Sequence, residues 1–134
     1  MLRSIDISDY MTKNPVTVYD DDRLSNAIET ITSNRLSGVC VVNRKDDLVG
    51  VLSEMDCLRA IVSATYNQDG DIGKVHEFMT AEVQCCSLQD NIVDVALDMI
   101  AKGHRRRPVV QDGKLIGQIT CRQILRVVHS FGGR

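Results

Sequence analysis

The chain repeats itself, and a repeat this long constrains the fold more than any other feature of the sequence. The stretch DYMT at 9–12 returns as EFMT at 77–80, which is 68 positions later. After one deletion the offset becomes 67, as the match of Gly50 with Gly117 shows. One pattern of apolar positions therefore spans almost the whole chain, and the architecture has to be built from two copies of one unit.

Both copies predict the same order of elements: a strand, a helix, two strands joined by a tight polar turn, and a closing helix. Each first helix has one apolar face at i, i+3, i+4 and i+7 spacing, made by Leu24, Ala27, Ile28 and Ile31, and by Ile92, Val95, Ala96 and Met99. Asp22 and Asp90 precede these helices and are the expected N-caps. The other expected elements are strands at 16–18, 38–42, 48–53, 83–86, 108–111 and 115–120, and closing helices at 54–64 and 121–130.

A single copy of about 55 residues would bury too little apolar surface to be stable alone. We therefore expect an α+β fold in which two pseudo-twofold-related β-α-β-β-α repeats pack sheet to sheet, with clefts where the halves meet. The stretch YNQDGDIGK is polar and contains glycine, which is typical of a linker. The predicted organisation is a first repeat at 1–65, a linker at 66–76 and a second repeat at 77–134.

Composition indicates an ordinary soluble globule of 134 residues with a net charge of −2 and a pI near 5.9. This balance gives no global attraction to nucleic acid or to an anionic membrane. No apolar run approaches the ~20 residues that would cross a bilayer, and the N-terminus lacks the apolar region of a signal peptide. We expect a cytoplasmic protein.

The chain has five cysteines, an odd number, and no C-x-x-C spacing. Together with the expected location, this argues against a disulfide framework and favours buried, unreactive thiols. The three histidines are scattered, and their spacing to the cysteines fits no usual metal site. The cysteines are Cys40, Cys57, Cys85, Cys86 and Cys121.

Two ordered sets of short motifs carry a family resemblance. The first copy reads MTKNPVTV, LSNAIETI, GVCVV and GVLSEMD, and the second reads MTAEVQCC, IVDVALDMI, RRRPVV and GQITCRQ. The chain resembles a stand-alone tandem cystathionine-β-synthase (CBS) domain pair, also called a Bateman module, over roughly residues 9–129. The resemblance implies the same fold, an adenosine-containing ligand between the repeats, regulation of another protein, and association into dimers.

The spacing of Ser53 and Asp56 admits two interpretations. The first is a capping box, in which Ser53 caps the closing helix and Asp56 reaches back to the Ser53 amide. Thr120 and Gln123 are a valid capping pair at the matching places of the second repeat. The second interpretation is a ligand site, because the resemblance implies that this Ser/Thr-x-x-Asp holds ribose and phosphate. The two can coexist, since the cap would orient the carboxylate.

The resemblance also implies the remaining contacts of this site. The run HRRR at 104–107 would supply phosphate ligands through Arg106 and Arg105, although a solvated charge run is the alternative. On a strand, Arg106 would point opposite to Arg105 and Arg107. The adenine would lie against Met11, Thr12, Val16, Leu36, Ser37 and Val51. A weaker second site would use Thr120, Gln123 and Thr80, because Gln123 lacks the charge of Asp56.

No glycine-rich phosphate loop, nucleophile–base pair or metal motif is visible in the sequence, so we expect no enzyme and no required cofactor or metal. The predicted function is a regulatory module that senses AMP, ADP, ATP or S-adenosylmethionine and signals to a partner protein, with the preferred ligand and a role for Mg²⁺ left open. The alternative is a ligand-free oligomerisation or protein-interaction module. Nucleic-acid binding through HRRR is disfavoured by the acidic pI and by only five aromatic residues. We expect a homodimer, an unknown protein partner and no membrane contact.

Overall fold

The computed structural model describes residues 2–67 and 72–132, which leaves part of the predicted linker outside the described residues. The chain forms two compact units. We call Val16–Val83 the inner unit, because it is continuous, and Met1–Pro15 with Gln84–Arg134 the outer unit, because both ends of the chain build it. The units are therefore a different partition of the chain from the two sequence repeats.

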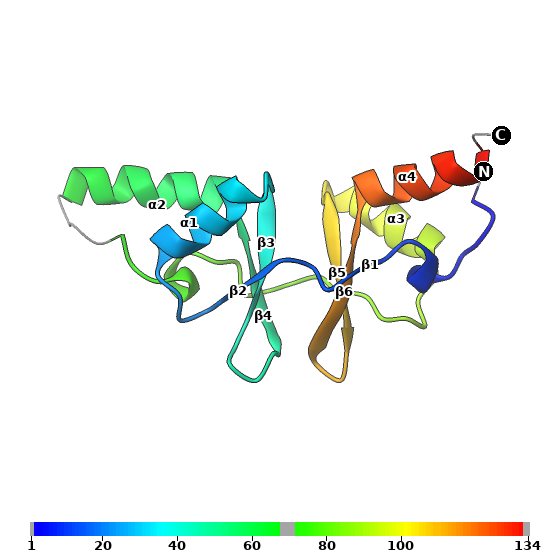
Figure 1. Cartoon of the computed structure of the whole chain (residues 1–134), viewed down its shortest axis with the longest axis horizontal. Helices are drawn as coiled ribbons and strands as arrows, with labels where there is room; N and C mark the ends of the chain where they lie inside the picture. Colours follow the sequence, from blue (N-terminus) through cyan, green and yellow to red (C-terminus); the bar gives the residue numbers. More distant parts are fainter. Residues whose placement is uncertain (1, 68–71, 133–134) are drawn as a thin grey trace. The chain divides into compact units, whose positions relative to one another are not determined.

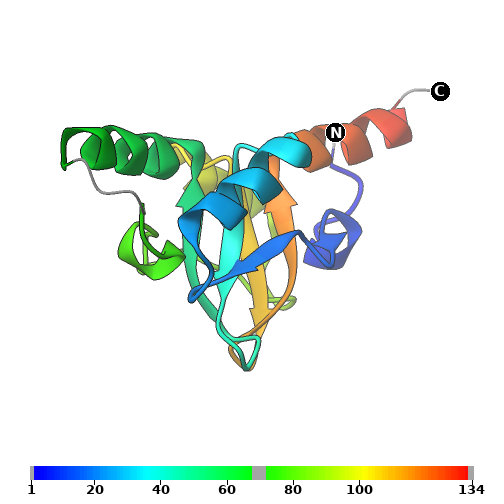
Figure 2. The ribbon, with the colours of Figure 1, turned by 60° about the vertical axis from the view of Figure 1, so that its left-hand side comes forward.

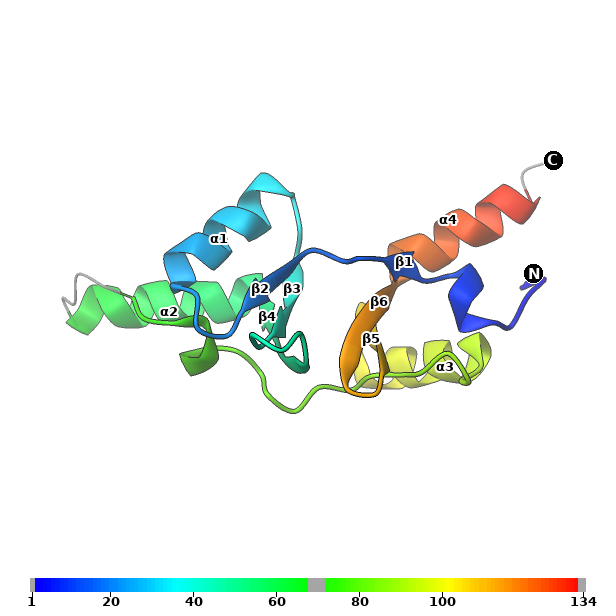
Figure 3. The same cartoon turned by 60° about the horizontal axis from the view of Figure 1, so that its bottom comes forward.

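The inner unit is a three-stranded sheet with two helices on one face (Figures 1 and 3). Its strand order is β2-β3-β4, with β2 parallel to β3 and β3 antiparallel to β4. Leu24, Ala27 and Ile31 of the predicted apolar face are buried in one core with residues of β3, and the closing helix adds Cys57 and Ala60 to it. The elements are β2 (Thr17–Tyr19), α1 (Leu24–Ser33), β3 (Gly38–Val42), β4 (Leu48–Ser53) and α2 (Glu54–Asn67).

The outer unit also has a three-stranded sheet, but its strand order is β1-β6-β5 and its neighbouring strands are all antiparallel. Ile92, Val95 and Met99 of its first helix are buried in its core. Figure 2 shows that each hairpin, β3–β4 and β5–β6, closes in a tight turn. The elements are β1 (Thr12–Lys13), α3 (Ile92–Lys102), β5 (Arg106–Gln111), β6 (Lys114–Thr120) and α4 (Cys121–Gly132). The α+β class is thus confirmed.

The strand predicted at 83–86 is wrong in its extent. Only Cys86 pairs, as an isolated parallel bridge to Val109. Its N–H donates to the Pro108 carbonyl at 2.9 Å, and its carbonyl accepts from the Val110 N–H at 2.9 Å. Val83 belongs to the inner unit and Gln84 to the outer unit, so the predicted strand is divided between the two units.

The first residues of each repeat pack in the unit built by the other repeat. We call residues 2–13 and 72–80 the leader segments. The first leader adds β1 to the edge of β6, where Thr12 lies opposite Gln118. The second leader adds Thr80 to the edge of β4, where Thr80 and Val51 exchange two backbone hydrogen bonds of 2.9 and 3.0 Å. Both exchanges occur at matching positions of the repeat.

A short 3-10 helix in each leader anchors the exchange in an apolar core. These helices are η1 (Ile7–Asp9) and η2 (Val75–Glu77), and their first residues, Ile7 and Val75, are fully buried. Each leader also brings a methionine onto a glycine of the neighbouring strand. A Cβ on Gly117 would lie 2.3 Å from Met11 Cγ, and one on Gly50 would lie 2.6 Å from Met79 Sδ. A Cβ at either position would force the methionine or the neighbouring backbone to shift.

The predicted N-caps, Asp22 and Asp90, are wrong by one residue. The N-cap positions are Arg23 and Asn91, and Asn91 Oδ1 accepts from the Val93 N–H at 2.7 Å. The two aspartates instead each accept from the backbone N–H three residues earlier, at 2.9 and 2.8 Å. They therefore close the turn that leads into the helix rather than capping the helix itself.

The prediction of buried thiols is confirmed for Cys40, Cys57 and Cys86 and is wrong for Cys85 and Cys121, which are exposed. Cys85 lies in the segment that passes between the units, and Cys121 is the first residue of α4. Burial raises the pKa of the Cys86 thiol to about 11 and also raises the pKa of Cys57. The thiols of Cys57 and Cys86 are therefore poor nucleophiles.

Replacing Gly117 by alanine should destabilise the protein by about 1–3 kcal/mol, because the new methyl group would overlap Met11 and would also lie 2.8 Å from the Thr12 carbonyl oxygen. Urea unfolding would measure the loss. The double variant Gly117→Ala/Met11→Ala should recover part of it, since the shortened side chain leaves room. A single variant as stable as the wild type would contradict this packing.

Labelling with a thiol reagent at pH 8 should give two fast equivalents, from Cys85 and Cys121, and three slow ones. Cys85→Ser should remove one fast equivalent, whereas Cys86→Ser should leave the fast phase unchanged. A fast phase that loses amplitude in Cys86→Ser would show that Cys86 is accessible in solution.

Candidate functional site

Ser53 and Asp56 form a reciprocal capping box at the start of α2. The Asp56 N–H donates to Ser53 Oγ at 3.1 Å, and the Ser53 N–H donates to Asp56 Oδ2 at 2.9 Å. Ser53 ends β4 and Glu54 begins the helix, so the box forms where strand geometry changes to helix geometry. It satisfies two backbone donors that would otherwise lack a partner. The capping-box interpretation is therefore confirmed.

The cap uses only one oxygen of the Asp56 carboxylate. The side chain is 13% exposed, and Oδ1 lies 3.5 Å from Nη1 of Arg59, whose side chain is 74% exposed. An ion pair with so exposed a partner is weak and easily displaced. Oδ1 can therefore accept a hydrogen bond from a ligand hydroxyl while Oδ2 stays in the cap, so the ligand interpretation is compatible with the geometry.

Three more of the predicted ligand residues lie beside this box in the inner unit. The Ser37 carbonyl accepts from the Glu54 N–H at 2.9 Å, which holds the end of the α1–β3 loop against the start of α2. Val51 lies two residues before Ser53 on β4 and pairs with Thr80. The prediction grouped Thr80 with Thr120, whereas the structure places it in the inner unit with Ser53.

The remaining two inner-unit residues are less closely tied to the box. Leu36 is half-buried and packs on the inner core. Val16 is 38% exposed and immediately precedes β2. The structure gives no contact that joins either side chain to Ser53 or Asp56.

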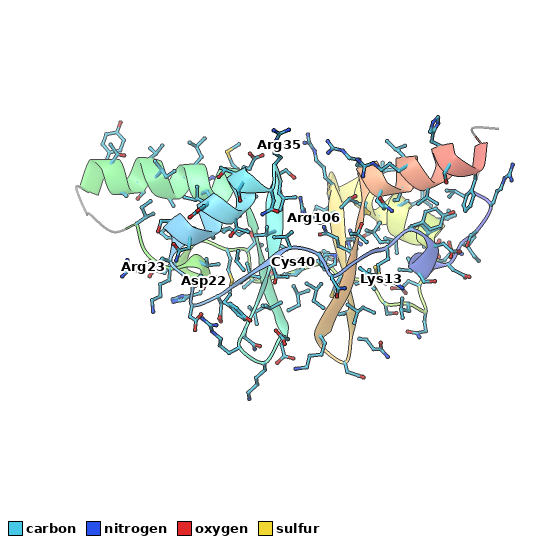
Figure 4. All side chains as sticks on the ribbon, viewed as in Figure 1. Lys13, Asp22, Arg23, Arg35, Cys40 and Arg106 are labelled. Atoms are coloured by element: carbon cyan, nitrogen blue, oxygen red, sulfur yellow. The ribbon has the colours of Figure 1, made fainter. Side chains whose placement is uncertain are left out.

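The other predicted residues belong to the outer unit. Arg106 begins β5 (Figure 4), lies opposite Thr120 on β6, and donates from Nη1 to Gln118 Oε1 at 3.5 Å. Thr12 lies opposite Gln118. Because paired residues share a face, these polar side chains line one face of the outer sheet. Half-buried Met11 packs on the core of the same unit.

The capping pair of the second repeat is only half formed. The Gln123 N–H donates to Thr120 Oγ1 at 3.1 Å, which is the helix cap. Among the hydrogen bonds given for the described residues, none runs from the Thr120 N–H back to the Gln123 side chain. The amide of Gln123 is thus less firmly held than the carboxylate of Asp56. That Asp56 and the arginines serve one ligand stays a prediction.

Arg107 is a feature that the sequence analysis did not assign. As strand alternation predicts, it points away from the face of Arg106, and it is 4% exposed. Its Nη1 lies 2.8 Å from Asp98 Oδ2, and its Nη2 lies 3.3 Å from His104 Nδ1. Hydrogen bonds from Lys102 and then Arg107 lower the pKa of Asp98. Strand alternation could have predicted this burial, because Arg107 lies two residues before buried Val109 and therefore points to the same face of the strand.

In the described residues, no three His, Cys, Asp or Glu side chains converge as metal ligands would. Nor does any described helix have the length and apolar character needed to span a bilayer.

Comparison with known proteins decides the family. A family model described as "CBS domain" matches residues 7–63 and 75–130, which is most of the chain. The chain belongs to the CBS-domain family. Both matches begin in a leader segment, so each family unit includes residues that pack in the other repeat's unit.

Individual proteins are similar over nearly the whole chain. MJ1426 of Methanocaldococcus jannaschii is 31% identical and the match covers 85% of each chain. MJ1225 of the same organism is 27% identical over 92% of this chain, which spans only 43% of that protein. The solved structure of CBSX2 in complex with AMP is 27% identical, covers 96% of this chain and 98% of that one, and has a TM-score of 0.83.

Asp56→Ala should lower the free energy of unfolding by about 1 kcal/mol, because it removes the acceptor of the Ser53 N–H. Gln123→Ala is the matched control at the same place of the second repeat, and it should cost much less, since its cap bond comes from the backbone N–H. Chemical unfolding of both variants tests this. Equal losses would contradict the asymmetry of the two caps.

Proposed function

We propose that this CBS-domain protein is a regulatory module that binds an adenine nucleotide through Asp56. The observation that carries the proposal is that the cap fixes Oδ2 of the Asp56 carboxylate, while Oδ1 lies 3.5 Å from Nη1 of the exposed Arg59. A ribose presents two adjacent hydroxyl donors, and a carboxylate held in place accepts from them by charge-assisted hydrogen bonds. The cap removes the entropy cost of orienting it.

A similar protein supports the class of ligand. CBSX2, at 27% identity and nearly full coverage, has been solved with AMP. Ligands of this class combine a base, a ribose and an anionic tail, and they include AMP, ADP, ATP and S-adenosylmethionine. The half-formed cap at Gln123 favours one well-occupied site over two. Neither Mg²⁺ nor another cofactor is required for a carboxylate to hold a ribose.

Arg106 and Arg105 are the proposed phosphate contacts. A guanidinium matches the oxygens of a phosphate in geometry and charge. Arg105 is exposed, and the backbone that carries it is tied to α4 by the hydrogen bond from the Cys121 N–H to its carbonyl at 3.0 Å. The matching positions of the first repeat, Ser37 and Gly38, carry no charge, so only the second repeat offers such a pair.

A ligand-free interaction module is the second candidate, and one observation favours it. One helix, α2, exposes five large apolar side chains, more than a solvated helix needs. They are Met55, Leu58, Ile61, Val62 and Tyr66. The homodimer, the signalling partner, the cytoplasmic location and the absence of catalysis remain predictions, and light scattering of the purified protein would test the first of them.

A thermal-shift panel with AMP, ADP, ATP, S-adenosylmethionine, adenosine and an RNA oligonucleotide tests the proposal. A ligand at 100 times its dissociation constant stabilises a protein by about 2.7 kcal/mol. For a chain of this size that is a rise in Tm of roughly 5–15 °C. We expect this rise for at least one adenine nucleotide. No response to any of them would favour the interaction module, and a response to RNA alone would favour nucleic-acid binding.

Asp56→Asn separates the two roles of this residue. Asparagine keeps an oxygen for the Ser53 N–H, so the Tm without ligand should change little, while the loss of charge should weaken nucleotide binding about tenfold or more. Gln123→Ala should keep the full nucleotide response. If Asp56→Asn keeps it as well, Asp56 serves only the helix.

A further inference from the structure

We infer that Arg107 is a positioning residue, whose buried contacts with Asp98 and His104 fix the backbone that presents Arg105 and Arg106. This inference rests on the proposed function, because it assigns the two arginines to the anionic tail of the nucleotide. All the residues involved lie in the outer unit.

The guanidinium of Arg107 is buried among groups that hold it from two sides. Nη1 donates to the Asp98 carboxylate on α3, and Nη2 lies 3.3 Å from the imidazole Nδ1 of His104. Its Nε is buried without a hydrogen-bond partner among the described residues. An arginine this deep costs desolvation energy that a single ion pair repays only in part. A residue kept at such a cost calls for a role besides packing.

The contact between Arg107 and His104 joins residues on either side of the two proposed phosphate ligands. Arg107 and His104 flank Arg105 and Arg106 in the sequence, so a side-chain contact between the outer pair restricts the backbone of the inner pair. Guanidinium nitrogens can only donate, so His104 Nδ1 is the acceptor. The His104 N–H also donates to the Met99 carbonyl at 2.9 Å, which ties this end of the segment to α3.

The charges of the cluster favour the same interpretation. Asp98 is shared by Arg107 and Lys102, whose Nζ lies 3.0 Å from the same Oδ2. One carboxylate thus serves two cations, next to a further two in Arg105 and Arg106. The surroundings of the segment stay net positive, as a site for an anionic group requires.

The first repeat provides an internal comparison. At offset 68, the positions of Asp98, His104 and Arg107 hold Thr30, Leu36 and Val39, which form no charged cluster. In the first repeat, a threonine and two apolar residues therefore occupy the places of the charged cluster, and Val39 is fully buried. The buried charge accompanies the arginine pair and is not demanded by the fold. Its role is the presentation of that pair.

The experiment gives the second repeat the residues that the first repeat has at the three matching positions. The triple variant Asp98→Thr/His104→Leu/Arg107→Val replaces the charged cluster by residues that already work in this fold, and swaps of this kind are often tolerated. Calorimetric titration would compare AMP with adenosine, which lacks the phosphate. We expect AMP to bind about tenfold more weakly and adenosine to bind as to the wild type. Arg106→Gly, the residue of the first repeat, should give the same pattern.

Two results would overturn the inference. An unchanged ratio of AMP to adenosine affinity would show that the cluster does not position the arginines. An equal loss for both ligands would show that it only supports the fold. His104→Leu alone is a second variant in case the triple variant misfolds. It removes the contact between His104 and Arg107 and keeps the buried ion pair. It should shift the ratio of AMP to adenosine affinity in the same direction.

Hydrogen exchange of the Cys121 amide supplies a readout that needs no ligand, because this N–H donates to the Arg105 carbonyl. We expect His104→Leu to speed its exchange about tenfold while the exchange of α3 amides is unchanged. Unaltered protection would also refute the inference. If the wild-type protein binds neither AMP nor adenosine, the proposed function fails, and the exchange measurement still decides whether Arg107 and His104 hold the segment.

Discussion

The exchange of leader segments is the constraint on which the rest of the structure depends. Each sheet is finished by backbone hydrogen bonds to a segment from the other repeat, at Thr12 on β6 and at Thr80 on β4. Buried Ile7 and Val75 add apolar anchors to both cores. Because a leader pairs with part of the β6 edge and at one residue of the β4 edge, these edges are partly shielded from pairing with another chain. The loops and helix ends that carry the proposed ligand contacts rest on these sheets.

The two repeats share a backbone plan and differ in the chemistry they place on it. In the inner unit, Ser53 and Asp56 form a complete capping box that leaves one carboxylate oxygen for a ligand. In the outer unit, Thr120 keeps half of that cap, while Arg106 and buried Arg107 bring positive charge. The differing side chains thus place a carboxylate in one unit and guanidinium groups in the other.

Sequence reasoning predicted the fold class and most elements, because apolar periodicity and an internal repeat report directly on burial. It placed the Ser53–Asp56 box correctly, since capping depends on local spacing. It gave the wrong extent for the strand at 83–86, and it did not foresee the leader exchange. Both depend on which distant segment a strand meets, and local pattern carries no record of that. The depth of Arg107 was missed because a run of three arginines looks like solvent-exposed charge.

The exchange has a consequence for the origin of such a chain. A lone copy of the repeat would have a leader with nowhere to pack and a sheet edge with nothing to cover it. Two separate copies could meet both needs only by donating leaders to each other. A chain with one copy of the repeat would therefore fold only as a dimer. Joining two such copies end to end would turn that partnership into one polypeptide and free each half to evolve on its own.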